Sequence, residues 1–264
     1  MSGTVAPARH FVQSLSRGFA VVRALSAPEP LTLSEVARAS ALSRAAARRF
    51  LLTLEELGYV RAVAGRFSLT PRVLELGFAY LSALGLPDVA QPHLEALVEE
   101  VRESSSVSVL DGASIVYVAR VPTRRIMNVT VSIGTRFPAY ATSMGRVLLA
   151  DLEPDTRDAL LDGVALEPLA LETITTRAQL EEELERVRRQ GYAIVDQELE
   201  SGLRSVAAPI RDRRRRAVAA VNLAVPAVRV SVEEIERSLL EPLLGTAAAI
   251  ERDLALAAAA SADG

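Results

Sequence analysis

The sequence predicts an α+β protein that is built from two domains. Residues 31–69 first show helical apolar spacing and then two short strand-like runs. Residues 87–257 combine alternating apolar runs with helical segments, a pattern typical of an antiparallel sheet flanked by helices. The chain has 264 residues, half of them apolar, which is enough for two hydrophobic cores.

Proline and glycine positions divide the chain. Pro71 suits the first turn of a helix, and Gly85-Leu86-Pro87 marks the place where that helix ends. The predicted parts are a disordered tail (1–12), an N-terminal domain (13–71), a linker helix (72–86), a C-terminal domain (87–257) and a second tail (258–264). The linker helix is apolar on more than one side, so we expect a second subunit to cover it.

The N-terminal domain begins with three predicted helices. The first spans Ser14–Leu25, and its spacing turns Phe19, Val22 and Leu25 inward. The second spans Ser34–Ser40 and is followed by a turn of two residues. The close succession of the second and third helices predicts a helix-turn-helix.

The third predicted helix spans Ser43–Leu57, and Ser43 is a good N-cap because its side-chain oxygen accepts a free backbone N–H. The apolar residues on one face are Phe50, Leu51, Leu54 and Leu57. The outward residues of the first half are Arg44, Ala45, Arg48 and Arg49, whereas Glu55 and Glu56 lie in the second half. A helix that enters the DNA major groove by its N-terminal end needs this polarity, because carboxylates near phosphates repel.

Two short strands are predicted after this helix, at Tyr59–Ala62 and Arg66–Leu69, around a turn at Ala64-Gly65. Helix, turn, helix and ribbon form the pattern of a winged helix-turn-helix, a DNA-binding module. The predicted DNA contacts are Arg17, Ser43, Arg44, Ala45, Arg48, Arg49, Arg61 and Arg66. The alternative interpretation is an arginine-rich solvated surface on an ordinary helical domain.

Charge and composition exclude several function classes. Residues 1–75 carry ten arginines and five acidic residues, whereas residues 76–264 carry twenty arginines and twenty-eight acidic residues. A polyanion-binding surface is therefore expected in the N-terminal third. The absence of lysine excludes a P-loop lysine and a Schiff base, and the absence of cysteine excludes disulfides. No apolar run is long enough to span a bilayer and no signal-peptide core is present, so we expect a cytoplasmic protein without a membrane partner.

The C-terminal domain alternates between predicted strands and helices. Strands are expected at Ser106–Leu110, Ser114–Val121, Ile126–Ile133, Tyr192–Asp196, Ser205–Ile210 and Ala217–Val225. Helices are expected at Pro87–Glu103, Thr142–Ala150, Arg177–Gln190 and Ser231–Leu256. Asp111-Gly112 is a strong two-residue hairpin signal. Asp196, Glu198 and Glu200 alternate along the sequence, which predicts that they share one face of a strand. A GAF/profilin-like α/β domain fits this order better than a doubly wound sheet.

Two motifs of the C-terminal domain carry a resemblance to a known family. They are FPAYATSMGRVLLA (137–150) and GYAIVDQELESGLRSVAAPIRD (191–212), and they follow SLSRGFAVVRAL and GRFSLTPRVLELG in the N-terminal domain. Through them the chain resembles IclR-type transcriptional regulators over essentially its whole length. The segment 124–150 resembles most the subgroup that regulates β-ketoadipate-pathway genes of aromatic acid catabolism.

This resemblance implies a sequence-specific transcriptional regulator. It implies a homodimer or a dimer of dimers on a palindromic DNA operator, and a small organic acid, here an aromatic one, bound as effector in the C-terminal domain. The effector positions that the resemblance implies are the helix start Tyr140–Gly145, the strand end at Val195-Asp196, Ser205, and Asn222 with Ala224.

The residue types at these positions suit an aromatic acid. Thr142, Ser143, Met144 and Gly145 open a helix, whose unpaired N–H groups favour a carboxylate. Tyr140 and Met144 suit packing against a ring, and Ser205 and Asn222 suit a ring hydroxyl. The remaining candidates are Arg204 and Arg124 as carboxylate partners, with Asp196 at the strand end. Each has an ordinary alternative, such as a plain N-cap at Ser143 or solvated arginines.

An enzyme is the competing hypothesis. Residues 141–145 are similar to the nucleophile elbow G-x-S-x-G but lack its first glycine, and the two histidines, His10 and His93, fall in the predicted tail and on a helix. No cysteine or histidine pair has metal-ligand spacing. We therefore expect no catalytic residue, no metal and no cofactor. The alternative is an enzyme acting on a small aromatic acid, with the winged helix as a protein-interaction module; a steep salt dependence of DNA binding would argue against it.

Overall fold

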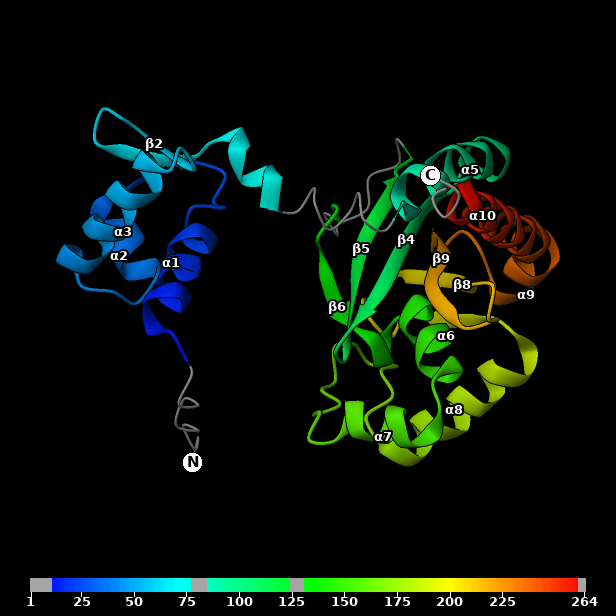
Figure 1. Ribbon diagram of the computed structural model, residues 1–264. Coiled ribbons are helices and arrows are strands. Elements are labelled where there is room, and N and C mark those ends of the chain that lie inside the picture. Colours follow the sequence, from blue (N-terminus) through cyan, green and yellow to red (C-terminus); the bar gives the residue numbers. More distant parts are fainter. Residues whose placement is uncertain (1–10, 77–84, 124–130, 261–264) are drawn as a thin grey trace. The chain divides into compact units, whose positions relative to one another are not determined.

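The computed structural model describes residues 11–76, 85–123 and 131–260, which belong to two compact units, residues 1–80 and 81–264 (Figure 1). Most of the predicted N-terminal tail and of the predicted linker helix lies outside the described residues. Within the described residues, no helix is both long enough and apolar enough to cross a membrane.

The first unit contains the three predicted helices, within two residues of their predicted bounds. They are α1 (Gln13–Ala24), α2 (Leu33–Ala39) and α3 (Arg44–Glu56). Their core contains Val21, Leu25, Val36, Leu51 and Val60, all 5% exposed or less. The predicted inward position of Phe19 is wrong: its side chain is 48% exposed, because the buried face of α1 passes through Val21 and Leu25 instead.

A small three-stranded sheet completes this unit. It consists of β1 (Leu31–Thr32), β2 (Val60–Val63) and β3 (Arg66–Leu69), in the order β1-β3-β2. The ribbon β2–β3 is the predicted wing, and Ala64 and Gly65 both have positive φ, as a tight hairpin turn requires. The strand β1 was not predicted from the sequence. It ends at Thr32, which caps α2 in a capping box with Glu35.

The second unit is a six-stranded antiparallel sheet with helices on both faces. The strands lie in the order β6-β5-β4-β9-β8-β7. Their bounds are β4 Ser104–Asp111, β5 Ser114–Val121, β6 Arg136–Pro138, β7 Ala193–Asp196, β8 Leu203–Arg211 and β9 Ala217–Pro226. In the predicted strand Ile126–Ile133, residues 126–130 lie outside the described residues. Residues 131–133 do not form a strand, because they lead into the turn at Gly134.

Helices cover the two faces of this sheet. The helices α5 (Leu86–Val101) and α10 (Leu240–Ala260) pack on one face, and α6 (Ser143–Asp151) and α8 (Arg177–Gln190) belong to the other (Figure 1). The shorter helical segments are η1 (Pro71–Val73), η2 (Ala139–Ala141), α7 (Pro154–Leu161), α9 (Val232–Glu234) and the π-helical turn η3 (Ile235–Leu239). Of these, η2 and α7 were not predicted.

The strand β9 shows how the two faces differ. Val221, Leu223 and Val225 belong to the core under α5 and α10. Because side chains alternate along a strand, Asn222 and Ala224 face the opposite side, toward the start of α6. The sheet therefore presents the polar side chain of Asn222 to the N-terminal end of α6.

Candidate functional site

The helix α3 presents the predicted arginine face. The Ser43 Oγ accepts a hydrogen bond from the Ala46 N–H at 3.2 Å, which confirms the predicted N-cap. Arg44, Arg48 and Arg49 are exposed, and so is Ala45. Among the described residues these three arginines form no ion pair, so their guanidinium groups are available to an external anion. The predicted inward position of Leu57 is wrong, since its side chain is 50% exposed one residue beyond α3.

The arginines of the wing are more constrained. The Arg61 Nε donates to the Ser68 Oγ at 3.2 Å, across the ribbon. The Arg66 Nη1 donates to the Pro30 carbonyl at 3.0 Å and lies 4.0 Å from the Glu35 carboxylate. Both remain exposed, as does Arg17 on α1, so the geometry leaves all three accessible.

The second unit contains a cavity between the start of α6 and the sheet. Its lining residues are Tyr117, Arg120, Val131, Phe137, Ala141, Thr142, Ser143, Met144, Val195, Leu199, Leu203, Ser205, Asn222 and Ala224. The volume not occupied by atoms is about 550 Å³, part of it open to solvent. A water-sized sphere has only about 30 Å³ of room in this cavity, so the cavity is narrow. Its mixture of apolar walls with a few polar groups is typical of a small-molecule site.

Arg120 is the positive charge of the cavity. It is half-buried, and this burial lowers the pKa of its guanidinium because the charged form loses solvation. Its hydrogen bond to a described residue is from Nη1 to the Ser106 Oγ, a long one of 3.4 Å. No carboxylate of the described residues pairs with it. A half-buried cation without an acidic partner favours an anionic ligand.

Asn222 provides an unpaired acceptor. Its side chain is 5% exposed, and its Oδ1 is buried without a hydrogen-bond partner in the described part of the chain. A buried acceptor left unpaired costs free energy, which a ligand donor recovers. In the sheet, Asn222 pairs with Ser106 of β4, and Ser106 pairs with Arg120 of β5. The guanidinium and the amide therefore occupy one row across three strands.

The start of α6 forms another wall. The Thr142 Oγ1 accepts from the Gly145 N–H at 3.1 Å, so Thr142 is the N-cap and this N–H is not free. The Ser143 hydroxyl donates to the Ser205 Oγ at 2.9 Å, which ties α6 to β8. The free N–H groups that remain for an anion at this helix start are those of Ser143 and Met144.

Aromatic side chains form the apolar part of the cavity. The rings of Tyr117 and Phe137 meet edge to face, with centroids 5.9 Å apart and an interplanar angle of 81°. Burial raises the pKa of Tyr117 to about 12, because the phenolate would lose its solvation. Together with Met144, these rings suit the flat face of an aromatic ligand.

The structure brings together five of the ten predicted effector residues: Thr142, Ser143, Met144, Ser205 and Asn222. Tyr140, Gly145, Asp196 and Arg204 do not line the cavity, and Arg124 lies outside the described residues. Tyr140 is buried, and its hydroxyl donates to the Glu167 carbonyl at 2.8 Å. Gly145 lies against Ala139, on the side of α6 away from the cavity lining.

Four of the five N–H donors of Arg204 are taken by other groups of the protein. Its Nε and Nη2 donate to the two oxygens of Asp196 at 2.7 and 2.8 Å, and its Nη1 donates to the carbonyls of Val230 and Ala227. The hydrogen bonds from Arg204 also lower the pKa of Asp196. The predicted roles of both residues in effector binding are therefore replaced by a structural ion pair between β7 and β8.

Ser143 of this cavity occupies the serine position of the segment 141–145, which is similar to a nucleophile elbow. The Ser143 hydroxyl is directed to Ser205, and no histidine lines the cavity. No group of three or more His, Asp or Glu residues within the described residues could hold a metal ion. Glu198, expected on a strand face, lies beyond the end of β7 and pairs with Arg146.

Models of two known domains match the chain. The IclR helix-turn-helix domain matches residues 14–64, and the C-terminal domain of the bacterial transcriptional regulator IclR matches residues 78–252. The chain belongs to the IclR family. It is a DNA-binding transcriptional regulator, with a winged helix-turn-helix followed by an α/β effector domain.

Relatives of this IclR-family regulator agree over nearly the whole chain. The Pca regulon regulatory protein of Pseudomonas putida is 39% identical over 92% of this chain and 83% of its own length. A structure from Rhodococcus sp. RHA1, described as a transcriptional regulator, is 58% identical with a TM-score of 0.83, covering 92% and 98% of the two chains. An IclR homologue from Microbacterium hydrocarbonoxydans in complex with 4-hydroxybenzoate is 28% identical with a TM-score of 0.81, covering 91% and 98%.

Proposed function

We propose that this IclR-family protein regulates genes of aromatic acid catabolism and that a hydroxylated benzoate is the effector bound in the cavity. The observation that carries this proposal is the row Arg120–Ser106–Asn222. It holds a half-buried cation without an acidic partner among the described residues at one end and an unpaired buried carbonyl at the other.

A hydroxybenzoate satisfies both ends. Its carboxylate is the anion that the Arg120 fork requires, and a charge-assisted bidentate pair is strong in a partly buried site. Its phenolic hydroxyl is the donor that the Asn222 Oδ1 lacks. The ring between these groups lies against Tyr117, Phe137 and Met144. Two strand spacings separate Arg120 from Asn222, which is about 10 Å between their backbones.

The relatives support the same ligand class. The Pseudomonas putida relative is a regulator of the Pca regulon, and the Microbacterium hydrocarbonoxydans homologue binds 4-hydroxybenzoate. Neither property belongs to this chain by similarity alone, but both agree with the polarity of its cavity.

We also propose how the protein meets DNA. The exposed arginines of α3, with Arg61 and Arg66 of the wing and Arg17 of α1, contact a palindromic operator. A homodimer or a dimer of dimers presents two or more copies of this surface, as a palindrome requires. The protein then works where the DNA is, in the cytoplasm.

A ligand panel tests the effector class. Isothermal titration with 4-hydroxybenzoate, protocatechuate, benzoate and β-ketoadipate should give the tightest binding for the hydroxylated aromatic acids. The same ligands should change the gel-shift affinity for the intergenic DNA beside the gene, since coupling between two sites is reciprocal. Failure of every aromatic acid to bind would overturn the effector class. Turnover of an aromatic acid without any DNA binding would favour the enzyme hypothesis instead.

A further inference from the structure

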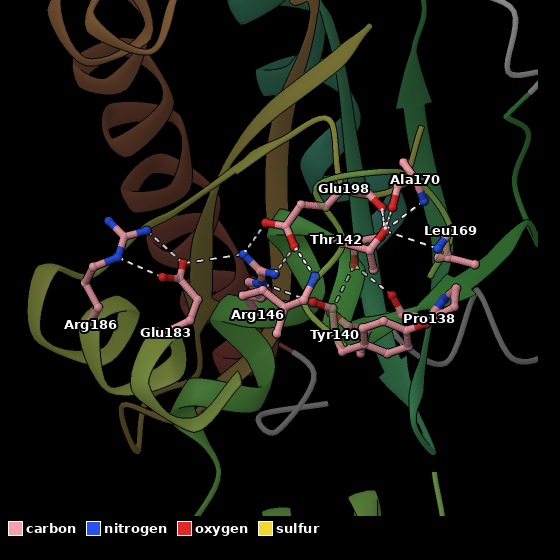
Figure 2. Close-up of polar contacts among 12 residues, drawn as sticks. Pro138, Tyr140, Thr142, Arg146, Leu169, Ala170, Glu183, Arg186 and Glu198 are labelled. Carbon is pink, nitrogen blue, oxygen red and sulfur yellow. Dashed lines mark hydrogen bonds and ion pairs between the residues drawn. The ribbon is translucent and has the colours of Figure 1, made fainter. Parts of the chain in front are cut away.

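A buried ion pair joins α6 to the loop between β7 and β8. The Arg146 Nη1 donates to the Glu198 Oε1 at 2.7 Å, and the Arg146 Nη2 donates to the Glu198 Oε2 at 2.5 Å (Figure 2). Only 2% of the Arg146 side chain and 10% of the Glu198 side chain are exposed. Neither residue lines the cavity, although both belong to segments that do.

The remaining hydrogen bonds of this pair go to the backbone of cavity-forming segments and of the loop beside them. The Arg146 Nε donates to the Tyr140 carbonyl at 3.0 Å, in the turn that precedes the lining residues of α6. The Glu198 Oε2 accepts from the Ile174 N–H at 3.1 Å, and the Glu198 carbonyl accepts from the Thr173 hydroxyl at 2.6 Å. The ion pair is therefore the junction of three chain segments around residues 140, 174 and 198.

A third charge supports the arginine from α8. The Glu183 Oε1 lies 3.5 Å from the Arg146 Nη1, and Arg186 donates to both oxygens of Glu183 at 2.8 Å (Figure 2). Arg146 is thus held from two sides, by the loop and by α8. A guanidinium bound in this way has one orientation, because its planar fork matches the carboxylate only in that geometry.

The loop that follows β7 has no regular secondary structure. Residues 197–202 form turns and bends rather than a strand, and Gln197 has a φ of +58°, which is unfavourable for a residue other than glycine. Leu199 of this loop and Leu203, the first residue of β8, line the cavity. Glu198 immediately precedes Leu199 in the chain. The ion pair therefore restricts the position of Leu199 relative to the start of α6.

Stability alone does not explain a buried ion pair at this place. Burial of two charges costs desolvation, and apolar residues of similar volume often stabilise a fold as well or better. What an ion pair adds is a defined geometry. In this chain that geometry fixes an irregular loop against the helix that opens the cavity.

We propose that Arg146 and Glu198 are a positioning pair for the effector cavity, which sets effector affinity by holding residues 197–203 in place without touching the effector. This inference rests on the proposed function in so far as the cavity holds the effector. A protein whose binding-competent loop conformation is present only part of the time binds with an affinity reduced by that fraction.

The chain provides a matched control for this pair. Arg157 of α7, also buried, pairs with Glu181 of α8 at 2.7 Å, and neither residue lines the cavity. Glu198→Gln and Glu181→Gln thus each remove one acidic partner from a buried arginine of the same unit. They differ in whether that partner belongs to a cavity wall.

The experiment compares the two variants in the full-length protein. Titration with 4-hydroxybenzoate should give a Kd about tenfold higher or more for Glu198→Gln. A tenfold increase is expected if the loop adopts its binding conformation about a tenth of the time. Hydrogen exchange without ligand should be faster in residues 197–203 of this variant. Glu181→Gln should change neither quantity, whatever its effect on the melting temperature.

Equal Kd values and equal exchange in the two variants would overturn the proposal, since the pair would then serve stability alone. If Glu198→Gln does not fold, Thr173→Val tests how the loop is held while the ion pair is kept. This variant removes the hydrogen bond to the Glu198 carbonyl together with those from the Leu169 and Ala170 N–H groups. If the wild-type protein binds no 4-hydroxybenzoate, the proposed effector class is wrong, but the exchange comparison still decides whether the pair holds the loop.

Discussion

Arg120 and Asn222 lie in one row of the six-stranded sheet, with Ser106 between them. Removal of the charge at one end of this row, by Arg120→Met, should weaken binding of 4-hydroxybenzoate by about 1.5–3 kcal/mol, the value of a hydrogen bond to a charged group. The neutral analogue 4-hydroxybenzamide should lose much less. Isothermal titration of both ligands measures this difference, with Arg120→Lys as the variant that keeps the charge. An unchanged preference for the acid over the amide in Arg120→Met would show that Arg120 does not bind the ligand carboxylate.

Replacement of the amide at the other end should act on selectivity instead. In Asn222→Leu, the preference for 4-hydroxybenzoate over benzoate should fall by about 1 kcal/mol, about fivefold, because the acceptor for the hydroxyl is gone. The stability of the free protein should stay equal or rise, since a buried and unpaired carbonyl is removed. Parallel titrations and thermal melts separate the two effects. A variant that is less stable and equally selective would show that Asn222 stabilises the sheet and does not bind the ligand hydroxyl.

The role of Arg120 could not be predicted from the sequence, for a geometric reason. Tyr117 and Arg120 are three residues apart, so a regular strand would place them on opposite faces. The pairing of β4 with β5 shifts register between Val107 and Ser108, because the bulge leaves Val118 without a partner. The bulge puts Tyr117 and Arg120 on the same face. Local sequence patterns do not indicate where such a bulge falls.

Elements with local signals were predictable, whereas partners from distant segments were not. The N-cap Ser43 and the turn at Ala64-Gly65 follow from the chemistry of a few neighbouring residues. Arg204 is typical of a carboxylate-binding residue in the sequence, but the register of β7 with β8 places it directly opposite Asp196. The two charges then neutralise each other.

Substitution of the α3 arginines tests the DNA surface. Arg48→Ala and Arg49→Ala should each weaken operator binding by about 1–3 kcal/mol if the side chain contacts a base. A phosphate contact should instead reduce the slope of log K against log salt by about one. Gel shifts at several salt concentrations distinguish the two, and Arg237→Ala, whose side chain is 73% exposed in the other unit, is the control. Wild-type affinity and slope in both α3 variants would refute the assignment of the recognition helix.

The contact of α6 with the preceding turn predicts a strict requirement for glycine. A Cβ on Gly145 would lie 2.1 Å from the Ala139 carbonyl oxygen and 2.4 Å from its Cα, both backbone atoms. Gly145→Ala should therefore shift α6 and destabilise the protein by about 1–3 kcal/mol, the usual cost of overpacking. Gly245→Ala on α10 meets no atom within 4 Å and should stabilise by about 0.5–1 kcal/mol. Urea unfolding of both variants checks the contrast, and similar values for the two would contradict the close contact at Ala139.

The buried phenol of Tyr117 predicts a specific loss of stability at alkaline pH. Burial raises the pKa of Tyr117 to about 12, above the ordinary value of 10, so the folded state holds this proton more tightly than the unfolded state. The resulting stability is complete below pH 10 and is lost as the pH rises toward 12. At pH 11 the loss amounts to about 1.4 kcal/mol, and Tyr117→Phe should escape it because phenylalanine does not titrate. Urea unfolding at pH 8 and pH 11 measures this difference between wild type and variant. Tyr192→Phe is the control, and it should change the pH dependence of stability less than Tyr117→Phe does, because Tyr192 is only partly buried. An equal pH dependence of wild type and Tyr117→Phe would mean that the phenol of Tyr117 is solvated in the folded state.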